Sequence, residues 1–269
     1  MPWSKSLLKL GLAASVLYAA SGFMLRMSTG ETVALTRQQR REMERKGITP
    51  SNSPTSSAMT AGAGGMGSSL ESVDLGGGSF MRGWMIDTGV CDDLSALMTK
   101  KRASGGALKG QVSMKGGNVP VVNKAIKDSE EISFDPRDSS PEFRAYLQQL
   151  QATMGSYLQE LPMAGAYGTF GLTSRTNLQW YPKGGGYKTW HTERTGRVEP
   201  EGSRHLVFMT YLNDVDDGGG TEFMHQKVTV QPRKGLTLIW PSDWTFTHRG
   251  VPSPTQEKSI ITGWFNFNS

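Results

Sequence analysis

The chain has 269 residues, which is enough for one substantial domain and a tail, since a single core of up to about 200 residues is normal. Its formal net charge of +5 belongs to residues 1–60, which hold eight of the 29 Lys and Arg but three of the 24 Asp and Glu. The remainder is neutral, so the basic pI does not indicate nucleic acid as a partner. The single cysteine, Cys91, excludes an intrachain disulfide framework.

Residues 1–30 are predicted to be a hydrophobic targeting or membrane-anchor segment. Between Lys9 and Arg26 stand 16 uncharged and mostly apolar residues, LGLAASVLYAASGFML, whereas a membrane-spanning helix needs about 20. The run can anchor the chain in a membrane if Lys9 reaches the interface. A cleaved signal peptide and an organelle presequence or buried helix are the other interpretations. We therefore expect an endomembrane-anchored or secretory-pathway protein, with an organelle as the alternative location.

Residues 31–79 are predicted to be a polar stalk followed by a linker. Residues 31–46, ETVALTRQQRREMERK, carry oppositely charged pairs but no apolar stripe, which is typical of a solvated stalk. Residues 51–79 are rich in Gly and Ser, and such a composition cannot bury enough apolar surface to offset its ordering entropy. We place the folded domain at residues 80–269.

A strand and two helices are the first elements expected in this domain. FMRGWMID (80–87) is predicted to be a strand, and CDDLSALMTKK (91–101) a helix with acidic residues in its first turn and lysines in its last. A longer helix should run over 141–161, with Ser140 as its N-cap and Pro141 as its first residue. Its apolar stripe consists of Phe143, Leu147, Leu150, Met154, Leu158 and Leu161.

After residue 165 the hydrophobic pattern changes from the period of a helix to that of a strand. The expected strands are NLQWY (177–181), YKTWHTE (187–193), RHLVFMTYLND (204–214), TEFMH (221–225), KVTVQP (227–232), LTLIWP (236–241) and SIITGWFNF (259–267). Short strands at close spacing, with no helices between them, predict an antiparallel sandwich or jelly roll. Helices that precede the strands predict an α+β fold in which these N-terminal helices pack on the major sheet.

The four histidines of the chain lie between residues 191 and 248 and indicate a candidate metal site. His191 and Glu193 are two residues apart, so on a strand their side chains would leave the same face. His248 is the third candidate ligand, although a lone strand histidine is more often structural. Two imidazoles and one carboxylate suit non-haem Fe(II), and the same set could hold a catalytic zinc. His205 and His225 are predicted to be ordinary packing or surface residues.

Four motifs follow one another in the second half of the chain. They are WYPKGGGYKTWHTE (180–193), TYLNDVDDGGGTEF (210–223), VQPRKGLTLIWP (230–241) and HRGVPSPTQEKSIITGWF (248–265). In this order they resemble the 2-oxoglutarate- and Fe(II)-dependent dioxygenases of the prolyl 4-hydroxylase-like branch. The resemblance covers roughly residues 80–269 and is strongest from Asn177 onwards. It implies a double-stranded β-helix (jelly roll) that uses Fe(II), 2-oxoglutarate as co-substrate, O2 and ascorbate.

The resemblance also implies that iron binds three residues, which are His191, Glu193 and His248. Glu193 departs from the aspartate that is commoner in this branch, and its extra methylene moves the carboxylate outward by about 1.5 Å. A rotamer change or a shift of the strand must absorb this difference for the oxygen to reach the metal. Because a carboxylate is kept at this position, we expect a hydroxylase rather than a halogenase.

Five further residues match positions with roles in the family. Lys258 matches the residue that pairs with the distal carboxylate of 2-oxoglutarate, and the hydroxyls of Tyr181 and Thr221 match groups that help to hold it. Arg204 and Trp264 match positions that contact the peptide in prolyl hydroxylases. The alternatives from the residues alone are a solvated edge-strand lysine, routine strand residues at 181 and 221, and a core tryptophan at 264.

The substrate that the resemblance favours is a prolyl residue of a polypeptide. We expect the glycine-containing segment 100–135 to form part of the mouth or a lid, and Trp190, Trp240 and Phe246 to wall the cavity. A small molecule is the alternative substrate, and the neutral body makes a nucleobase less favoured. A non-catalytic jelly-roll binding module and a zinc hydrolase on the same three ligands are the alternatives from other functional classes.

Overall fold

The computed structural model describes residues 70–76, 79–112, 120–196 and 199–268. The predicted targeting segment, residues 1–30, and most of the predicted stalk and linker therefore lie outside the described residues. Within the described ranges, the helices are too short or too polar to cross a membrane.

The helices and strands alternate irregularly along the chain. The helices are α2 (Thr88–Ala103) and α3 (Pro141–Glu160), with the short 3-10 turns η1 (Pro162–Gly165), η2 (Glu201–Ser203) and η3 (Trp244–Phe246). The strands that precede Pro182 are β1 (Glu71–Val73), β2 (Arg82–Met85), β3 (Leu108–Lys109), β4 (Lys127–Asp128), β5 (Glu130–Phe134), β6 (Phe170–Gly171) and β7 (Thr176–Tyr181). The remaining strands are β8 (Gly186–Tyr187), β9 (Arg204–Tyr211), β10 (Thr221–Phe223), β11 (Val228–Val230), β12 (Leu236–Pro241), β13 (His248–Gly250) and β14 (Lys258–Phe267).

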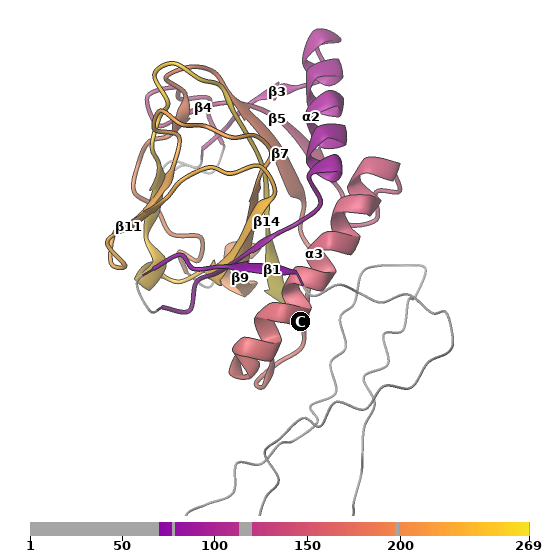
Figure 1. The fold of residues 1–269 in the computed structure, drawn as a ribbon, viewed down its shortest axis with the longest axis vertical. Coiled ribbons are helices and arrows are strands. Elements are labelled where there is room, and N and C mark those ends of the chain that lie inside the picture. Colours follow the sequence, from indigo (N-terminus) through magenta and orange to yellow (C-terminus); the bar gives the residue numbers. More distant parts are fainter. Residues whose placement is uncertain (1–69, 77–78, 113–119, 197–198, 269) are drawn as a thin grey trace, which may run out of the picture. The chain divides into compact units, whose positions relative to one another are not determined.

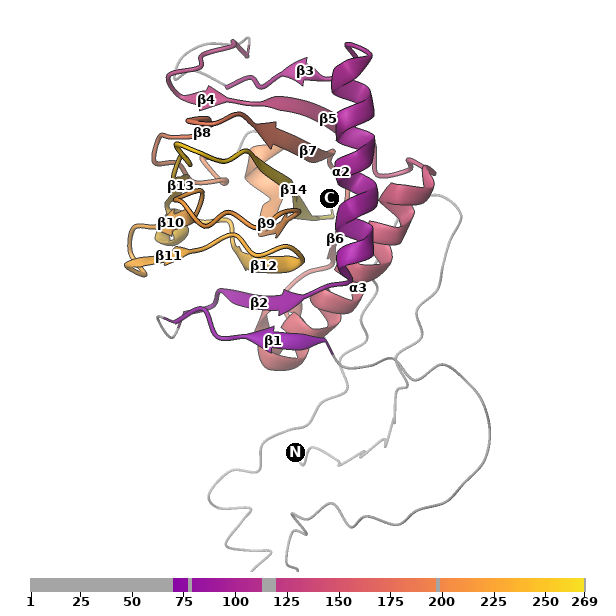
Figure 2. The same ribbon diagram turned by 45° about the horizontal axis from the view of Figure 1, so that its top comes forward.

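The strands form one large and two small antiparallel sheets. The large sheet has the order β1-β2-β12-β9-β14-β7-β5-β3, with β6 also paired to β14. One small sheet has the order β11-β10-β13, and β4 pairs with β8. Helices α2 and α3 lie on one side of the large sheet, and the small sheets lie on its other side (Figures 1 and 2). This arrangement confirms the predicted α+β jelly roll with helices against the major sheet.

Alternation along the strands of the large sheet separates two hydrophobic cores. On β14, Ile261 and Phe265 join the core that contains the buried faces of α2 and α3. Ile260 and Trp264, one residue out of phase, belong to the second core, between the sheets. Successive side chains of a strand leave opposite faces, so one strand supports the helices and lines the barrel interior at once.

Helix α3 follows the sequence prediction closely. Phe143, Leu150 and Met154 from its predicted stripe are buried against the sheet. Tyr146 shares a buried hydrogen bond of 3.0 Å with the hydroxyl of Thr210 on β9. Ser140 stands at the predicted N-cap position, but its side chain makes no capping hydrogen bond. The helix begins at Pro141, which lacks an N–H and so needs no capping partner there.

Several sequence predictions differ from the structure. The helix expected at 91–101 begins at Thr88, so its first turn holds no acidic residue. Residues 71–73, placed in the linker, form strand β1 and pair with β2, so strand structure begins before Phe80. The strand expected at 187–193 ends at Tyr187. After that point the backbone pairs with several segments: Lys188 donates to the carbonyl of Ile126, while residues 193 and 194 donate to that of Ser242. A single strand partner is absent there, so the extended ladder is lost.

Candidate active site

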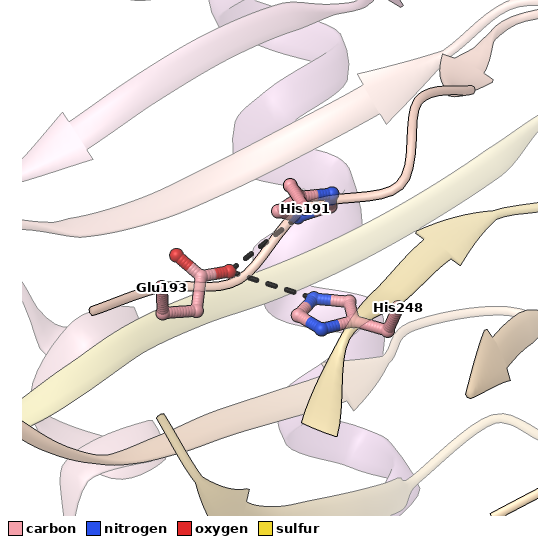
Figure 3. A group of neighbouring side chains, drawn as sticks. All are labelled: His191, Glu193 and His248. Carbon is pink, nitrogen blue, oxygen red and sulfur yellow. Dashed lines mark ion pairs between the residues drawn. The ribbon is translucent and has the colours of Figure 1, made fainter. Parts of the chain in front are cut away.

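His191, Glu193 and His248 meet on the inner side of the barrel. His191 and Glu193 lie in the segment that follows β8, and His248 begins β13 (Figure 3). The backbones of His191 and His248 exchange two hydrogen bonds of 3.0 and 2.9 Å. This isolated bridge brings the two imidazoles together although 57 positions separate them in the numbering. The convergence expected from the spacing of His191 and Glu193 is thus achieved by a bridge rather than by a strand.

The ligand atoms of these three residues are arranged to hold one metal ion. One potential ligand atom from each side chain lies within 4.8 Å of the other two. Glu193 Oε1 is 3.5 Å from Nε2 of His191 and 3.5 Å from Nε2 of His248. Two ligand atoms at about 2.1 Å from a common metal lie roughly 3.0–3.4 Å apart at octahedral or tetrahedral angles, so a small contraction would complete the site. The residues therefore fit a divalent transition metal.

The second nitrogen of each imidazole is held by a backbone carbonyl. His191 Nδ1 lies 2.9 Å from the carbonyl oxygen of Thr189, and His248 Nδ1 lies 2.9 Å from that of Phe246. An Nδ1–H that donates to a carbonyl leaves Nε2 as the lone-pair nitrogen, which is the one that a metal needs. The ring of Tyr187 also stacks on His191, with centroids 3.9 Å apart and an interplanar angle of 12°. Both rings are thus oriented before a metal arrives.

The charge state of the three residues also suits a metal. Burial raises the pKa of Glu193, but its contacts with His191 and His248 outweigh that effect and hold the pKa well below its ordinary value. Burial, with the nearby His191, lowers the pKa of His248. At neutral pH the site therefore offers an ionised carboxylate and a neutral His248 imidazole, which are the forms that bind metals.

Lys258 places a buried ammonium in the same cavity. It begins β14, its side chain is 5% exposed, and its Nζ donates a 2.7 Å hydrogen bond to the carbonyl of Gly219. No carboxylate among the described residues pairs with it, and burial lowers its pKa to about 8. Burying a cation without an anion costs free energy, so an acidic ligand would bind favourably in this part of the cavity.

Tyr181 and Thr221, the two hydroxyls expected beside this lysine, are both buried in the pocket lining. Tyr181 is the register partner of Lys258 on β7, and its ring centroid lies 5.2 Å from Nζ. Its hydroxyl donates to Gln179 Oε1 at 2.6 Å. Thr221 accepts a 2.7 Å hydrogen bond from the hydroxyl of Tyr211. Both hydroxyls therefore have protein partners, which orient them.

Arg204 and Trp264 also line the pocket, but their polar atoms contact Glu193. Trp264 Nε1 donates to Glu193 Oε2 at 3.0 Å. Arg204 Nη1 donates to the backbone carbonyl of Glu193 at 2.7 Å, and it lies 3.4 Å from Oε2. The sequence predicts a substrate-contact role for both residues, whereas these bonds connect them to a predicted metal ligand.

A pocket of about 800 Å³ contains all these groups. Trp190 and Trp240 are part of its wall as expected, whereas Phe246 is buried behind the lining. Segment 100–135 contributes Gln111, Val112, Lys127 and Glu131 to the lining, while Gly116 and Gly117 lie outside the described residues. The role of that segment as a lid stays a prediction.

The sequence did not indicate the polar wall that β4, β5 and β7 give the pocket. Lys127 pairs with Glu131, Ser129 donates to Glu131 Oε1 at 2.8 Å, and Gln179 neighbours Glu131 in register. The signal for this wall was period-two polarity in the segments EEISF and TNLQWY, which is weak because the partner strands are far away in sequence. Tyr187, which stacks on His191, was missed because the segment was expected to be a strand, in which residues four apart do not stack ring on ring.

The other two histidines lie apart from this site. His205 donates a 2.7 Å hydrogen bond from Nε2 to the carbonyl of Ala164 and packs against Phe170 and Phe267. His225 is exposed and contacts the edge of Trp244. Both are packing or surface residues, as the sequence predicted.

The fold and the donor set define a class of protein, the jelly-roll oxygenases with a site of two histidines and one carboxylate. Residues 176–266 match the family model described as the 2OG-Fe(II) oxygenase superfamily. The matched range contains His191, Glu193, His248 and Lys258. This region of the chain is similar to that superfamily, and the curated relative that it matches is a prolyl 4-hydroxylase subunit.

Several known proteins are similar to this chain in sequence or in fold. The prolyl 4-hydroxylase subunit alpha-2 of Gallus gallus is 28% identical over 76 residues, which cover 26% of this chain and 14% of that protein. A prolyl-4-hydroxylase of Pseudomonas putida has the same fold, with a TM-score of 0.55, 20% identity and coverage of 70% of this chain and 94% of that one. A prolyl hydroxylase of Trichoplax adhaerens, solved with a hypoxia inducible factor peptide fragment, gives a TM-score of 0.52, 19% identity and coverage of 69% and 83%.

Proposed function

We propose that this chain is an Fe(II)- and 2-oxoglutarate-dependent dioxygenase that hydroxylates a prolyl residue of a polypeptide, with release of succinate and CO2. The observation that carries the proposal is the placement of two complementary sites in one pocket. A cluster of His191, Glu193 and His248 suits a metal, and the buried ammonium of Lys258 has no anionic partner among the described residues. A metal-chelating keto acid with a second carboxylate satisfies both.

The metal part of the proposal rests on the three oriented ligands. His191 and His248 would bind through Nε2, because their Nδ1 atoms are engaged with carbonyls. Glu193 would bind through Oε1, which faces both imidazoles. Two imidazoles, one carboxylate and free coordination positions are the donor set of non-haem Fe(II) oxygenases, and the bound iron supplies the chemistry with O2.

The co-substrate part rests on Lys258 and its neighbours. Its ammonium would bind the distal carboxylate of 2-oxoglutarate. The hydroxyls of Tyr181 and Thr221 would donate to that group after turning from Gln179 Oε1 and Met209 Sδ. The rings of Trp240 and Tyr181 and the side chain of Ile260 make this part of the pocket partly apolar. A water-poor wall strengthens the attraction between the ammonium and the carboxylate.

The substrate and the location rest on similarity and on the N-terminal sequence. The relatives are prolyl hydroxylases, and the one from Trichoplax adhaerens was solved with a peptide. The polar wall around Glu131 and Gln179 offers hydrogen-bonding groups that suit peptide amides. We propose ascorbate as the reductant that keeps iron in the ferrous state. We also propose membrane association in the endomembrane system or passage through the secretory pathway, because of the apolar run in residues 10–25.

Succinate formation with full-length protein tests the proposal. Protein with Fe(II), ascorbate, O2 and 2-oxoglutarate is incubated with a Pro-rich peptide or with the same peptide carrying Ala in place of Pro. We expect the Pro-containing peptide alone to raise succinate formation several-fold and to gain one oxygen atom by mass spectrometry. His191→Ala should abolish the reaction, whereas His225→Ala, at an exposed histidine outside the pocket, should retain it.

Other outcomes identify the alternatives. Iron-loaded protein that forms no succinate under any condition would be a binding module. Zinc-dependent hydrolysis without any response to 2-oxoglutarate would identify a hydrolase. Succinate formation that responds to small molecules from a host extract, and not to peptides, would keep the oxygenase chemistry and replace the polypeptide substrate.

A further inference from the structure

The two carboxylate oxygens of Glu193 have different surroundings. Oε1 lies 3.5 Å from Nε2 of each triad histidine. Oε2 points to the other side, where it accepts a 3.0 Å hydrogen bond from Nε1 of Trp264. The carboxylate therefore presents one oxygen to the metal position and the other to an indole N–H.

Arg204 adds a second support on the Oε2 side. Its Nη1 donates to the backbone carbonyl of Glu193 at 2.7 Å and lies 3.4 Å from Oε2. The guanidinium also lies over the ring of Trp264, with its central carbon 3.8 Å from a ring centroid. Arg204, Trp264 and Glu193 thus contact one another pairwise. We call these three side chains the carboxylate clamp.

The clamp is held by the strands that form the barrel. Trp264 lies on β14 and Arg204 begins β9, and these two strands are neighbours in the large sheet. The Ser242 hydroxyl donates to the carbonyls of Arg204 and His205 at 2.6 and 3.0 Å. The carbonyl of the same serine accepts the N–H of Glu193. The segment that carries Glu193 and the strand that carries Arg204 are therefore fixed to each other.

We propose that Trp264 and Arg204 are positioning residues that bind Oε2 of Glu193 and thereby reserve Oε1 for the metal. A free carboxylate could turn to bind a metal with both oxygens, which would occupy a coordination position that the co-substrates need. The clamp prevents this rotation because Oε2 would have to leave a charge-assisted hydrogen bond in a partly buried site. The inference assumes a metal at the triad, as the proposed function does.

The length of the Glu193 side chain is what allows its two oxygens to reach both sets of partners. An aspartate would withdraw the carboxylate toward the backbone by about 1.5 Å, the length of one C–C bond. Its two oxygens could not then span from the histidines to Trp264 without movement of the backbone. The longer side chain, which departs from the commoner residue at this position, is thus matched to the arginine and tryptophan that receive its second oxygen.

Metal affinity provides a test that needs no turnover. Co(II), used as a spectroscopic probe for the ferrous site, is titrated into the full-length protein without O2 or 2-oxoglutarate. Its affinity is measured by calorimetry and its coordination by the visible absorption spectrum. Trp264→Phe removes the indole N–H but keeps a ring beside Arg204. We expect the variant to bind Co(II) about 10- to 100-fold more weakly, the usual effect of removing a hydrogen-bond partner of a metal ligand, with an altered spectrum.

The chain offers a matched control. Trp180 Nε1 also donates to a carboxylate, Glu257 Oε2, at the same distance of 3.0 Å. Its ring, however, packs with the core on the helix side of the sheet, away from the triad. Trp180→Phe deletes an equivalent hydrogen bond, so we expect unchanged Co(II) affinity. Thermal unfolding of the metal-free proteins shows whether either change merely disturbs the fold.

A second variant and a double-mutant cycle complete the test. Arg204→Lys retains the charge but cannot reach both acceptors, and we expect weaker Co(II) binding than in the wild type. In a Glu193→Asp background, Trp264→Phe should have no further effect, because the indole has lost its acceptor. Equal Co(II) affinity of the wild type, Trp264→Phe and Arg204→Lys would overturn the clamp while leaving the proposed function intact. Wild-type protein that binds no Co(II) would overturn both.

Discussion

At the scale of single residues, the site depends on side chains whose charge is set by burial. Lys258 is the clearest case, because its ammonium lies near the ring of Tyr181 and donates to the carbonyl of Gly219, but no acid among the described residues pairs with it. The same burial raises the pKa of Tyr181 well above its ordinary value of 10, so that hydroxyl stays neutral near pH 8. Lys258 is therefore the group whose charge changes beside the proposed carboxylate position.

The affinity for 2-oxoglutarate should depend on pH through Lys258. In the free enzyme its pKa is lowered to about 8 by burial, so the ammonium is present below this pH and is lost above it. The bound carboxylate requires the ammonium, and affinity should therefore fall as pH rises, by about tenfold per pH unit over the range above pH 8. Calorimetric titration of the Co(II)-loaded protein without O2, from pH 7 to 9.5, measures this slope.

The matched variant is Lys258→Arg, whose guanidinium stays charged throughout this range. We expect its affinity for 2-oxoglutarate to be nearly independent of pH, even if the altered shape lowers it overall. A wild-type affinity that stays flat between pH 7 and 9.5 would contradict the combination of a lowered Lys258 pKa with binding of the carboxylate by its ammonium.

At the scale of elements, helix α3 supports the sheet from the side opposite the pocket. Phe143, Leu150 and Met154 lie in the core that the outward-facing residues of β14 and β9 complete. The inward-facing residues of the same strands, among them Lys258 and Trp264, line the pocket. The helix therefore contributes to stability without touching the reactive groups.

Leu150→Ala should destabilise the fold by roughly 2–5 kcal/mol, because it removes a fully buried side chain and leaves a cavity. The free energy of unfolding is measured by urea titration of the metal-free protein. Gln148→Ala, at an exposed position on the same helix, serves as the control and should change it by less than about 0.5 kcal/mol. Equal urea midpoints for the two variants would mean that the packing of α3 is not what stabilises the sheet.

At the scale of the whole domain, the proposed metal site connects segments that lie far apart in the sequence. His191 and Glu193 lie in irregular chain after β8, and His248 lies in a three-residue strand of the small sheet. A metal ion that binds all three would link these segments in the folded state alone. Binding that favours the native state raises stability by mass action.

Metal removal should therefore lower the thermal stability of the full-length protein. At a free Co(II) concentration of 100 times the dissociation constant, the gain is about 2.7 kcal/mol, and EDTA should reverse it. Calorimetric unfolding with Co(II) and with EDTA measures the difference. His225→Ala should keep the stabilisation by Co(II), and His191→Ala should lose it. If His191→Ala is stabilised as much as the wild type, the metal binds elsewhere.

The fold class and most element positions were predictable from the sequence because they depend on local patterns. The spacing of apolar residues along the chain predicts the helical stripe of α3. It also predicts the period-two pattern of β7, β9, β12 and β14. Strand β1 was missed because residues 71–73 are a short run inside a Gly/Ser-rich segment, and their strand is defined by pairing with β2.

The sequence by itself determined which side chains are the candidates for the chemistry: the order of His191, Glu193, His248 and Lys258 predicted the metal and keto-acid sites that we propose. The tertiary structure alone decided how they are supported. The bridge joins His191 to His248, and Arg204 and Trp264 contact Glu193, so residues far apart in the sequence meet. The stacking of Tyr187 on His191 depends on the fold of the irregular segment after β8. Periodicity along a chain says which face a side chain occupies, whereas its partner across a sheet depends on register and topology, which emerge once the strands have paired.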